Sequence, residues 1–302
     1  MAIHWFYSDV EVIHAERIPA RGPVLIAMNH QNALIDALLA LTVIPRDLRI
    51  TAKATIGESL PGALLMKAVG IIPLQRATDS SGSTDPIRNR HSFQAMIDEL
   101  AREGAILVFP EGKSHNDPEV APLKTGLARV ALRARESGVS GIQIIPIGIT
   151  FENKAELHTR VSAEVGDPLQ IDDWAGDDAR ELTTAVAQRL ATISMVRDFR
   201  KLPPPSPAQR NDIVRLAAWW GRVMHEGPLR ITRHLAKKAS SDPGEPAMYT
   251  VIFGFGAILL SYLIEVAIVS SLFGWMIAAL FLASLITGAY WAAYAEHPTR
   301  RS

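Results

Sequence analysis

The sequence predicts an α/β fold with a mixed, mostly parallel sheet and flanking helices, followed by a C-terminal transmembrane helical hairpin. Short apolar runs alternate with segments of helical spacing up to about residue 200, which is typical of strand–helix units. A proline-rich stretch at 202–207 then breaks the chain, and Glu265 is the only charged residue from 247 to 295. We therefore expect three parts: a first domain over 1–200, a Pro-rich then basic connector over 201–246, and a two-helix membrane anchor over 247–302.

The composition excludes several kinds of site. Of the 302 residues, 48% are hydrophobic and 21% charged, close to globular averages, and a slightly positive mean hydropathy favours a membrane segment. The absence of cysteine excludes disulfides, thiolate metal sites and a cysteine nucleophile. The formal net charge is zero, so we expect no nucleic-acid partner. Charged residues interrupt the N-terminal stretch, so we expect no secretory signal and a cytoplasmic start: Asp9, Glu11, Glu16, Arg17 and Arg21.

The elements of the first domain follow from apolar spacing and from the turn residues between them. Strands are expected at 6–13, 24–28, 48–54, within 70–76 up to Arg76, and at 105–109, 142–150 and 161–165. Helices are expected at 33–43, 60–69, 87–103, 124–137 and 177–199. The helix at 87–103 stops at Gly104, and the one at 177–199 has an acidic start. We expect a mobile loop at 78–85, which is rich in Ser, Gly and Asp, and a second loop at 110–122.

The C-terminal apolar stretch has room for two membrane spans of about 20 residues each. We place them at 248–269 and 272–294, with a tight turn around Ser270, Ser271 and Gly274. Aromatic residues lie near the outer ends, as an interfacial belt requires: Tyr249, Tyr290, Trp291 and Tyr294. Basic residues flank the spans and none lies in the turn, which predicts cytoplasmic ends: Arg230, Arg233, Lys237, Lys238, Arg300 and Arg301. The alternative is a very apolar helical hairpin of a soluble protein.

The stretch from Asn29 to Asp36 is the first candidate site. It follows the strand at 24–28 and leads into a helix, so His30 is expected at the turn. On one helix, a separation of six residues puts two side chains on different faces, so Asp36 is expected to reach back to the His30 ring. A carboxylate on one ring nitrogen fixes the tautomer and leaves the other nitrogen as a base. The alternative is that both residues only cap a helix.

The loop from Phe109 to His115 is the second candidate site. It leaves a buried strand and leads towards the helix at 124–137. Gly112, with exposed backbone N–H groups and with Lys113 and Ser114 after it, suits an anionic oxygen. The alternative is an ordinary turn that contains a glycine.

Other cations lie at the ends of predicted elements. Arg76 and Lys53 each end a strand, and α/β proteins place their sites at strand ends, although an isolated charge there is more often solvated. Lys124 begins the helix after the second loop. His115 and Asp117 have the side chains of a metal site, but their spacing matches no zinc pattern, so we expect no metal.

Four stretches, taken in order, resemble the blocks of the glycerolipid acyltransferase family, which includes glycerol-3-phosphate and 1-acylglycerol-3-phosphate (lysophosphatidate) acyltransferases. They are Asn-His-x4-Asp at 29–36, the block at 70–76, Phe-Pro-Glu-Gly at 109–112, and Ile-Ile-Pro-Ile-Gly at 144–148. The resemblance covers roughly residues 10–200 and implies phospholipid biosynthesis. An acyl group passes from a thioester of coenzyme A or acyl carrier protein to a glycerol hydroxyl, with no cofactor beyond this donor.

The resemblance also implies roles for individual residues. His30 is the base, Asp36 orients it, and the acceptor is bound by Arg76, Glu111 and Gly112. This sequence departs from the family at 113–115, where Lys-Ser-His replaces the Thr-Arg-Ser of many members. The departure leaves open which cation holds the phosphate; the candidates are Arg76, Lys113 and Lys124, with Lys53 assisting.

The chemistry of these residues agrees with acyl transfer. A hydroxyl must lose its proton as it attacks a thioester, and a positioned histidine base is worth typically about 10²–10⁴-fold. Without cysteine or a serine elbow, we expect direct transfer in a ternary complex with membrane lipid, acyl thioester and glycerol phosphate as partners. The alternatives are a non-catalytic lipid-binding membrane protein of the same fold and a histidine-based thioester hydrolase. We favour glycerol-3-phosphate as acceptor, because without an apolar tail its affinity must come from cations, and lysophosphatidate stays open.

Overall fold

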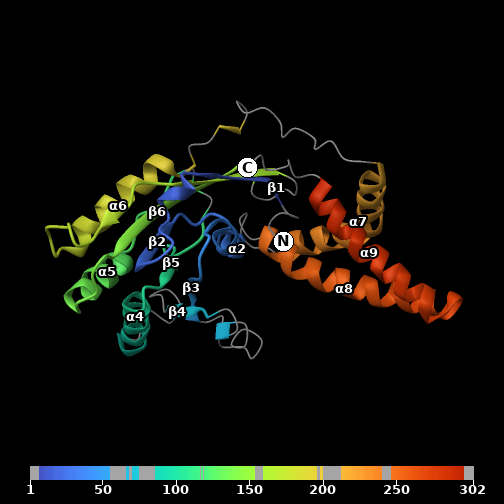
Figure 1. The fold of residues 1–302 in the computed structure, drawn as a ribbon, viewed down its shortest axis with the longest axis horizontal. Helices are drawn as coiled ribbons and strands as arrows, with labels where there is room; N and C mark the ends of the chain where they lie inside the picture. The colour runs from blue at the N-terminus through green and yellow to red at the C-terminus, as the bar shows by residue number, and fades with distance from the viewer. Residues whose placement is uncertain are drawn as a thin grey trace.

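An eight-stranded sheet forms the centre of the N-terminal part of the protein (Figure 1). The structure is a computed structural model, and it describes residues 7–54, 66–67, 70–74, 86–115, 117, 119–153, 159–195, 198–199, 212–239 and 246–295. The strands are β1 (Tyr7–Ile13), β2 (Val24–Met28), β3 (Leu48–Lys53), β4 (Ile72–Leu74), β5 (Ala105–Val108), β6 (Gln143–Phe151), β7 (Thr159–Val165) and β8 (Leu169–Gln170). Their order is β1-β7-β6-β2-β5-β3-β4, and β8 pairs with β6 beside this path.

The sheet is mixed and mostly parallel, which confirms the predicted fold class. Only the pairs that β6 makes with β7 and β8 are antiparallel among the described strands. Val24 at the start of β2 lies opposite Ala105 on β5 and Gln143 on β6. Because β2, β5 and β6 are parallel, the chain leaves all three at the same edge of the sheet. The two candidate sites, which follow β2 and β5, are therefore brought together.

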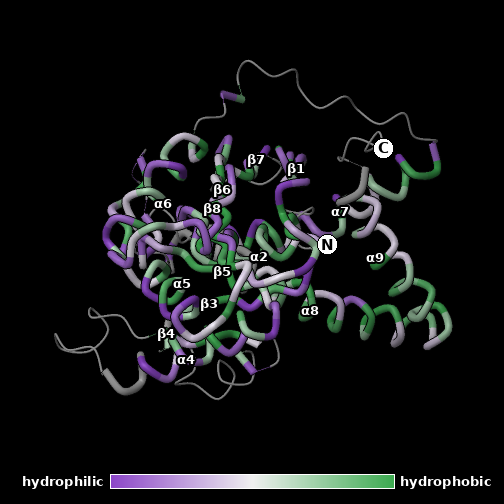
Figure 2. The backbone as a smooth tube through the Cα atoms, turned by 60° about the vertical axis from the view of Figure 1, so that its left-hand side comes forward, coloured by the Kyte–Doolittle hydropathy of each residue, from purple (hydrophilic) through white to green (hydrophobic). Residues whose placement is uncertain are grey.

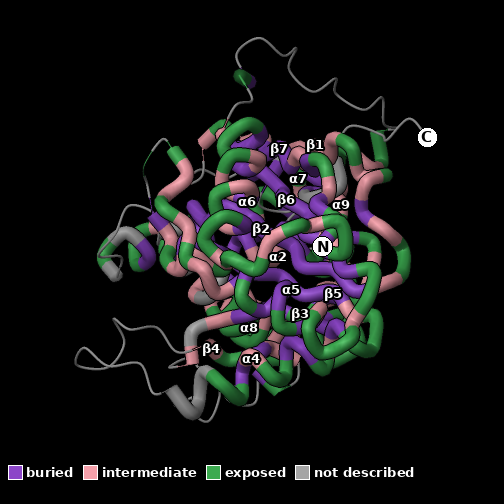
Figure 3. Tube along the Cα trace, turned by 90° about the vertical axis from the view of Figure 1, so that its left-hand side faces the viewer, coloured by how far each residue is buried: buried purple, intermediate pink, exposed green. Residues whose placement is uncertain are grey.

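Helices cover both faces of the sheet (Figure 1). α2 (Ala33–Val43) packs on one face, and α4 (Pro86–Ala101), α5 (Gly126–Glu136) and α6 (Ala179–Ile193) pack on the other. On the central strand β2, Val24, Ile26 and Met28 belong to the core on the α2 side, while Leu25 and Ala27 belong to the opposite core. This double burial explains why β2 is entirely apolar. Figure 3 shows the buried residues gathered along the strands of this sheet.

Most predicted elements of the first domain lie within two residues of their expected bounds, with two exceptions. The predicted helix at 177–199 is wrong at its end, because α6 stops at Ile193 and Met195 adopts a positive φ of 60°. The backbone turns there because it packs directly on β6. A Cβ added to Gly148 would lie only 2.3 Å from the Ile193 carbonyl oxygen. The two-residue strand β8 was not predicted, since so short a strand has no periodicity to detect.

Several predictions fall wholly or partly outside the described residues. Of the helix expected at 60–69, only residues 66–67 are described, and they are helical. The strand expected to end at Arg76 is present as β4, but Arg76 itself, the loop at 78–85 and the proline-rich stretch at 202–207 lie outside the described part of the chain.

Three helices form the C-terminal part: α7 (Asp212–Ala239), α8 (Pro246–Phe273) and α9 (Trp275–Ala295). α8 and α9 make an apolar hairpin that projects from the α2 side of the sheet, and Figure 2 shows its hydrophobic colouring. The turn is Gly274 alone, with φ +84°, so α8 runs past the expected turn at Ser270. Both helices are long and apolar enough to cross a membrane, over 253–273 and 275–292.

Candidate active site

The side chain of Asn29 anchors the start of the site to the sheet. Its amide nitrogen donates to the carbonyl oxygen of Ile149 over 3.1 Å, and its amide oxygen accepts from the N–H of Ile149 over 2.6 Å. Through these two hydrogen bonds, the Asn29 side chain extends the pairing of β2 with β6 by one residue beyond Met28. His30, the next residue, therefore leaves the sheet from a fixed point.

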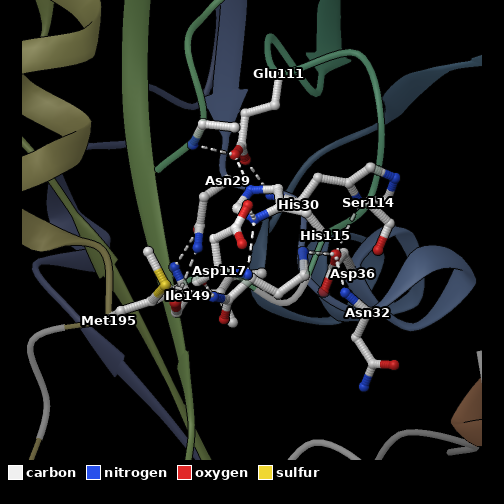
Figure 4. Close-up of polar contacts among 12 residues, drawn as sticks. Asn29, His30, Asn32, Asp36, Glu111, Ser114, His115, Asp117, Ile149 and Met195 are labelled. Carbon is white, nitrogen blue, oxygen red and sulfur yellow. Dashed lines mark hydrogen bonds and ion pairs between the residues drawn. The ribbon is translucent and has the colours of Figure 1, made fainter. Parts of the chain in front are cut away.

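His30 and Asp36 are in direct contact, as the sequence predicted (Figure 4). The distance from His30 Nδ1 to Asp36 Oδ2 is 2.8 Å, and Asp36 is fully buried. The same oxygen accepts from the backbone N–H groups of Gln31 and Asn32, each over 2.8 Å. These donors hold the carboxylate against the turn. The His30 Nδ1–H donates to the carboxylate, which leaves Nε2 as a proton acceptor.

The turn before α2 is strained and is supported by the second loop. Ala33 has a φ of +43°, a conformation that alanine rarely adopts. Its N–H donates to Ser114 Oγ over 3.2 Å. The His30 ring stacks on the ring of Phe109, with centroids 4.1 Å apart. The loop after β5 thus supports both the start of α2 and the His30 ring.

Glu111 joins the two loops with both of its carboxylate oxygens. Oε1 accepts from the backbone N–H of His30 over 2.6 Å, and Oε2 accepts from the N–H of Ala121 over 2.7 Å. Oε2 also bonds Nε2 of the His115 ring. Glu111 is only 2% exposed, so its charge is compensated by these donors rather than by solvent. The Glu111 carboxylate therefore faces backbone N–H groups of the protein.

His115 ends the predicted loop site, but its ring was considered there only as a possible metal ligand. Its backbone N–H donates to the carbonyl oxygen of His30 over 3.2 Å. Its ring Nδ1 accepts from the N–H of Asp117 over 3.2 Å, so Nε2 carries the proton that is donated to Glu111. His30 is therefore bonded to this loop through both its N–H and its carbonyl group. The spacing of Glu111 and His115 was the only sequence signal for this contact.

Tyr7 is a second residue that the sequence analysis missed. It lies on β1, is fully buried, and its hydroxyl accepts a hydrogen bond from Asn32 Nδ2 over 3.1 Å. Burial raises the pKa of Tyr7 well above its usual range, and the charge of Asp36 raises it further, against a smaller opposing effect of Asn32. Tyr7 is therefore a neutral hydroxyl behind the His30–Asp36 pair. Nothing in the pattern of β1 distinguishes it from an ordinary core residue.

The structure shows fewer contacts for the predicted anion-binding residues than for His30 and Asp36. Gly112 has a φ of +77°, and Lys113 and Lys124 have exposed side chains. The backbone N–H of Lys124 donates to the carbonyl oxygen of Pro110 over 2.7 Å, which closes the base of the loop. For Lys53 only the backbone is described, and Arg76 lies outside the described residues.

Comparison with known proteins matches this chain to one family. Residues 9–150 match the profile of the acyltransferase family. Glycerol-3-phosphate O-acyltransferase 2 of Saccharomyces cerevisiae is 29% identical over 111 residues, which is 35% of this chain but only 15% of the yeast protein. 1-acyl-sn-glycerol-3-phosphate acyltransferase alpha of Mus musculus is 26% identical over 192 residues, covering 61% of this chain and 63% of the mouse protein.

Among solved structures, the 1-acyl-sn-glycerophosphate acyltransferase PlsC of Thermotoga maritima has a TM-score of 0.49 to this chain at 18% identity. That match covers 63% of this chain and 72% of the Thermotoga chain. The family match includes the His30–Asp36 pair and the whole loop that follows β5. Through residues 9–150, this chain belongs to the acyltransferase family.

Proposed function

We propose that this protein moves a fatty acyl group from an acyl thioester to a hydroxyl of glycerol-3-phosphate or 1-acylglycerol-3-phosphate. The observation that carries the proposal is the 2.8 Å contact between His30 and Asp36, which leaves Nε2 of His30 as a base. Relatives named for both acceptors agree with this class of reaction.

The proposed reaction needs one base and no covalent enzyme intermediate. His30 Nε2 takes the proton of the acceptor hydroxyl as the hydroxyl oxygen attacks the thioester carbonyl carbon. The tetrahedral intermediate collapses, the carbon–sulfur bond breaks, and the thiolate leaves. The imidazolium then returns the proton to the thiolate, so the products are an ester and a free thiol. Asp36 compensates the charge that His30 acquires during the reaction.

For the acceptor, we propose that the loop after β5 supplies the binding groups. Gly112 offers its backbone, and Lys113 and Lys124 offer exposed ammonium groups on the same loop. We include Arg76 and Lys53 from the sequence pattern. The contacts of Glu111 support an indirect part, in which the carboxylate holds this loop against His30. We favour glycerol-3-phosphate, because a small dianion depends on such cations most.

One assay tests the function and the acceptor together. Purified full-length protein is given labelled acyl-coenzyme A or acyl carrier protein, with glycerol-3-phosphate, with lysophosphatidate, or with neither. We expect ester product with an acceptor and little thiol release without one. Thiol release that does not depend on an acceptor would favour a thioester hydrolase, and no turnover with any donor would favour a lipid-binding role. A kcat/KM at least tenfold higher for lysophosphatidate would reverse the acceptor assignment.

We also propose that the α8–α9 hairpin anchors the catalytic domain to a membrane. The start of α8 and the end of α9 would both lie on the cytoplasmic side. The length and apolar surface of the two helices support this, as do the basic residues on α7 before them. Deleting residues 247–302 should release the protein from membranes, at least at high salt. Continued membrane association of this variant at high salt would contradict the anchor.

A further inference from the structure

Met195 lies just past the end of α6, outside the segment that matches the family. The helix ends at Ile193, and Met195 has a φ of +60°, in the left-handed region that a bulky side chain rarely adopts. A residue other than glycine keeps such a conformation only where its surroundings fix it, and such residues gather at functional sites. The conformation of Met195 therefore indicates that its neighbours hold it in place.

The end of α6 is fixed on the same strand that fixes the start of the candidate site. A Cβ added to Gly148 on β6 would lie 2.7 Å from the backbone nitrogen of Ser194, so the two backbones are in contact. Ile149, the next residue on β6, makes both hydrogen bonds with the side chain of Asn29. Met195 therefore lies at a fixed place relative to the turn that Asn29 begins.

The Met195 side chain contacts the residue that follows His30. Its sulfur accepts a hydrogen bond from Nε2 of Gln31, which also lies 3.4 Å from the carbonyl oxygen of Asp117. The backbone N–H of Gln31 is one of the donors to Asp36, so Gln31 belongs to the same turn as the His30–Asp36 pair. Gln31 is only 8% exposed, whereas Met195 is half-buried. Met195 therefore presents a partly exposed apolar side chain beside the proposed base.

Two half-buried apolar side chains contact the turn at 29–33. Phe109 stacks on the ring of His30, with centroids 4.1 Å apart, and so supports the base itself. Met195 contacts the turn through Gln31 instead. In Figure 4, Met195 and Ser114 lie on opposite sides of His30. The base therefore has an apolar side chain on one side and the hydroxyl of the loop on the other.

The charges also differ between these two sides. Lys113, next to Ser114, has an exposed cationic side chain. On the other side, Asp117 contacts the same Gln31 amide as Met195, and its carboxylate is 77% exposed. A phosphate is attracted by the lysine and repelled by the carboxylate, whereas an acyl chain gains from apolar contact. This arrangement suits a phosphate-bearing acceptor on the Ser114 side and an apolar chain on the Met195 side.

We propose that Met195 contacts the acyl chain of the donor thioester near its carbonyl carbon and so determines which chains the protein accepts. A methionine suits this part because its unbranched, polarisable side chain adapts to the shape of an apolar ligand. The acceptor, bound by the loop after β5, approaches His30 from the Ser114 side. The inference rests on the acyl transfer proposed above and assigns the side on which the donor binds.

Protection of a thiol at position 195 tests this placement without turnover. The chain has no cysteine, so Met195→Cys carries a single thiol, and Met224→Cys on α7 is the matched control at another half-buried methionine. The full-length variants react with N-ethylmaleimide alone, with a palmitoyl thioester of coenzyme A or carrier protein, whichever supports turnover, or with the matching acetyl thioester. At about ten times its Kd, the palmitoyl donor should slow modification at 195 about tenfold, because about a tenth of the sites stay free. The acetyl donor should protect little, and the control should be modified at one rate throughout.

Kinetics with donors of different length separate selectivity from damage to the fold. Met195→Ala removes contact equivalent to about two CH₂ groups, each worth roughly fourfold in binding, so kcat/KM for the palmitoyl donor should fall about tenfold. For the acetyl donor it should change little. Met195→Leu keeps an apolar contact and should retain the preference for the long chain. Thermal unfolding of each variant reports any loss of folding.

The outcomes distinguish this assignment from the proposed function. Protection no greater with the palmitoyl donor than with the acetyl donor would overturn the part given to Met195, as would an equal loss of kcat/KM with both donors. Either result leaves the acyl transfer standing. Absence of turnover by the wild type with every thioester would instead remove the proposed function. If Met195→Ala does not fold, Met195→Cys still decides the question through protection.

Discussion

Replacing Asp36 with asparagine tests the geometry of the His30 pair more sharply than removing the carboxylate. All three donors around Asp36 converge on Oδ2, and Oδ1 has no hydrogen-bond partner among the described residues. An asparagine amide therefore has one favourable orientation, with its oxygen at the Oδ2 position. The reverse orientation would set its NH₂ group against the N–H groups of Gln31 and Asn32. The His30 tautomer should then survive the substitution.

The expected loss follows from the charge alone. A hydrogen bond to a charged group contributes roughly 1.5–3 kcal/mol and a neutral one about 0.5–1.5 kcal/mol. The difference of about 1–1.5 kcal/mol corresponds to a loss of about tenfold in kcat for Asp36→Asn. His30→Ala removes the base and should cost about 10²–10⁴-fold. The new NH₂ group, buried at the Oδ1 position, should also lower the free energy of unfolding by about 1–3 kcal/mol.

The assay is kcat with saturating labelled acyl thioester and acceptor, for wild type, Asp36→Asn and His30→Ala. Thermal unfolding of each variant separates lost folding from lost chemistry, and ¹⁵N chemical shifts of His30 report its tautomer. A loss in Asp36→Asn as large as that in His30→Ala, with the ring proton moved to Nε2, would refute the reasoning from the convergent donors.

Three further predictions concern the surroundings of the pair. Arg76→Ala should raise the KM for the acceptor about tenfold, because one charged hydrogen bond is lost, and should leave the KM for the thioester unchanged. A raised thioester KM with an unchanged acceptor KM would reverse the assignment. Glu111→Gln should lower both kcat and the free energy of unfolding, the latter by about 1–3 kcal/mol, while a raised acceptor KM with unchanged kcat would indicate direct acceptor contact. Because the pKa of Tyr7 is raised by folding, its contribution to stability is complete below about pH 10 and is lost as the pH rises from there towards the folded pKa. Tyr7→Phe should therefore make the alkaline decline of the unfolding free energy shallower, and an unchanged decline would contradict the assignment.

The contact between His30 and Asp36 was predictable because it is local. His30 lies at the turn between β2 and α2, Asp36 lies in the first helical turn of α2, and the apolar runs on either side fix this arrangement. The meeting of this turn with the loop after β5 was predictable in outline, since parallel strands end at one edge of a sheet. The strands and helices of the first domain were predictable because their apolar periodicity is strong.

The finer contacts depend on distances that no spacing encodes. Glu111 faces the backbone of His30 only because β2 and β5 are neighbours in one register. The early end of α6 depends on its approach to Gly148, a residue more than 40 positions before it. Likewise, only a basic connector was predicted where α7 lies, and the contacts of this helix become visible only when the hairpin is in place.

The position of β2 in the sheet constrains how the chain acquires its structure during synthesis. Both partners of β2 are made much later, β5 about 80 residues and β6 about 120 residues after it. Non-local parallel pairing is slow, so this apolar strand must wait without partners while the ribosome continues. The sheet is complete at Gln170, well before the hairpin begins at Pro246. At 5–20 residues per second, the sheet and its helices have about 4–15 s to fold before α8 and α9 are made. A destabilised β2 would lengthen that search, so we expect its variants to fail first as newly made chains, by aggregation or proteolysis, rather than as weakened enzymes.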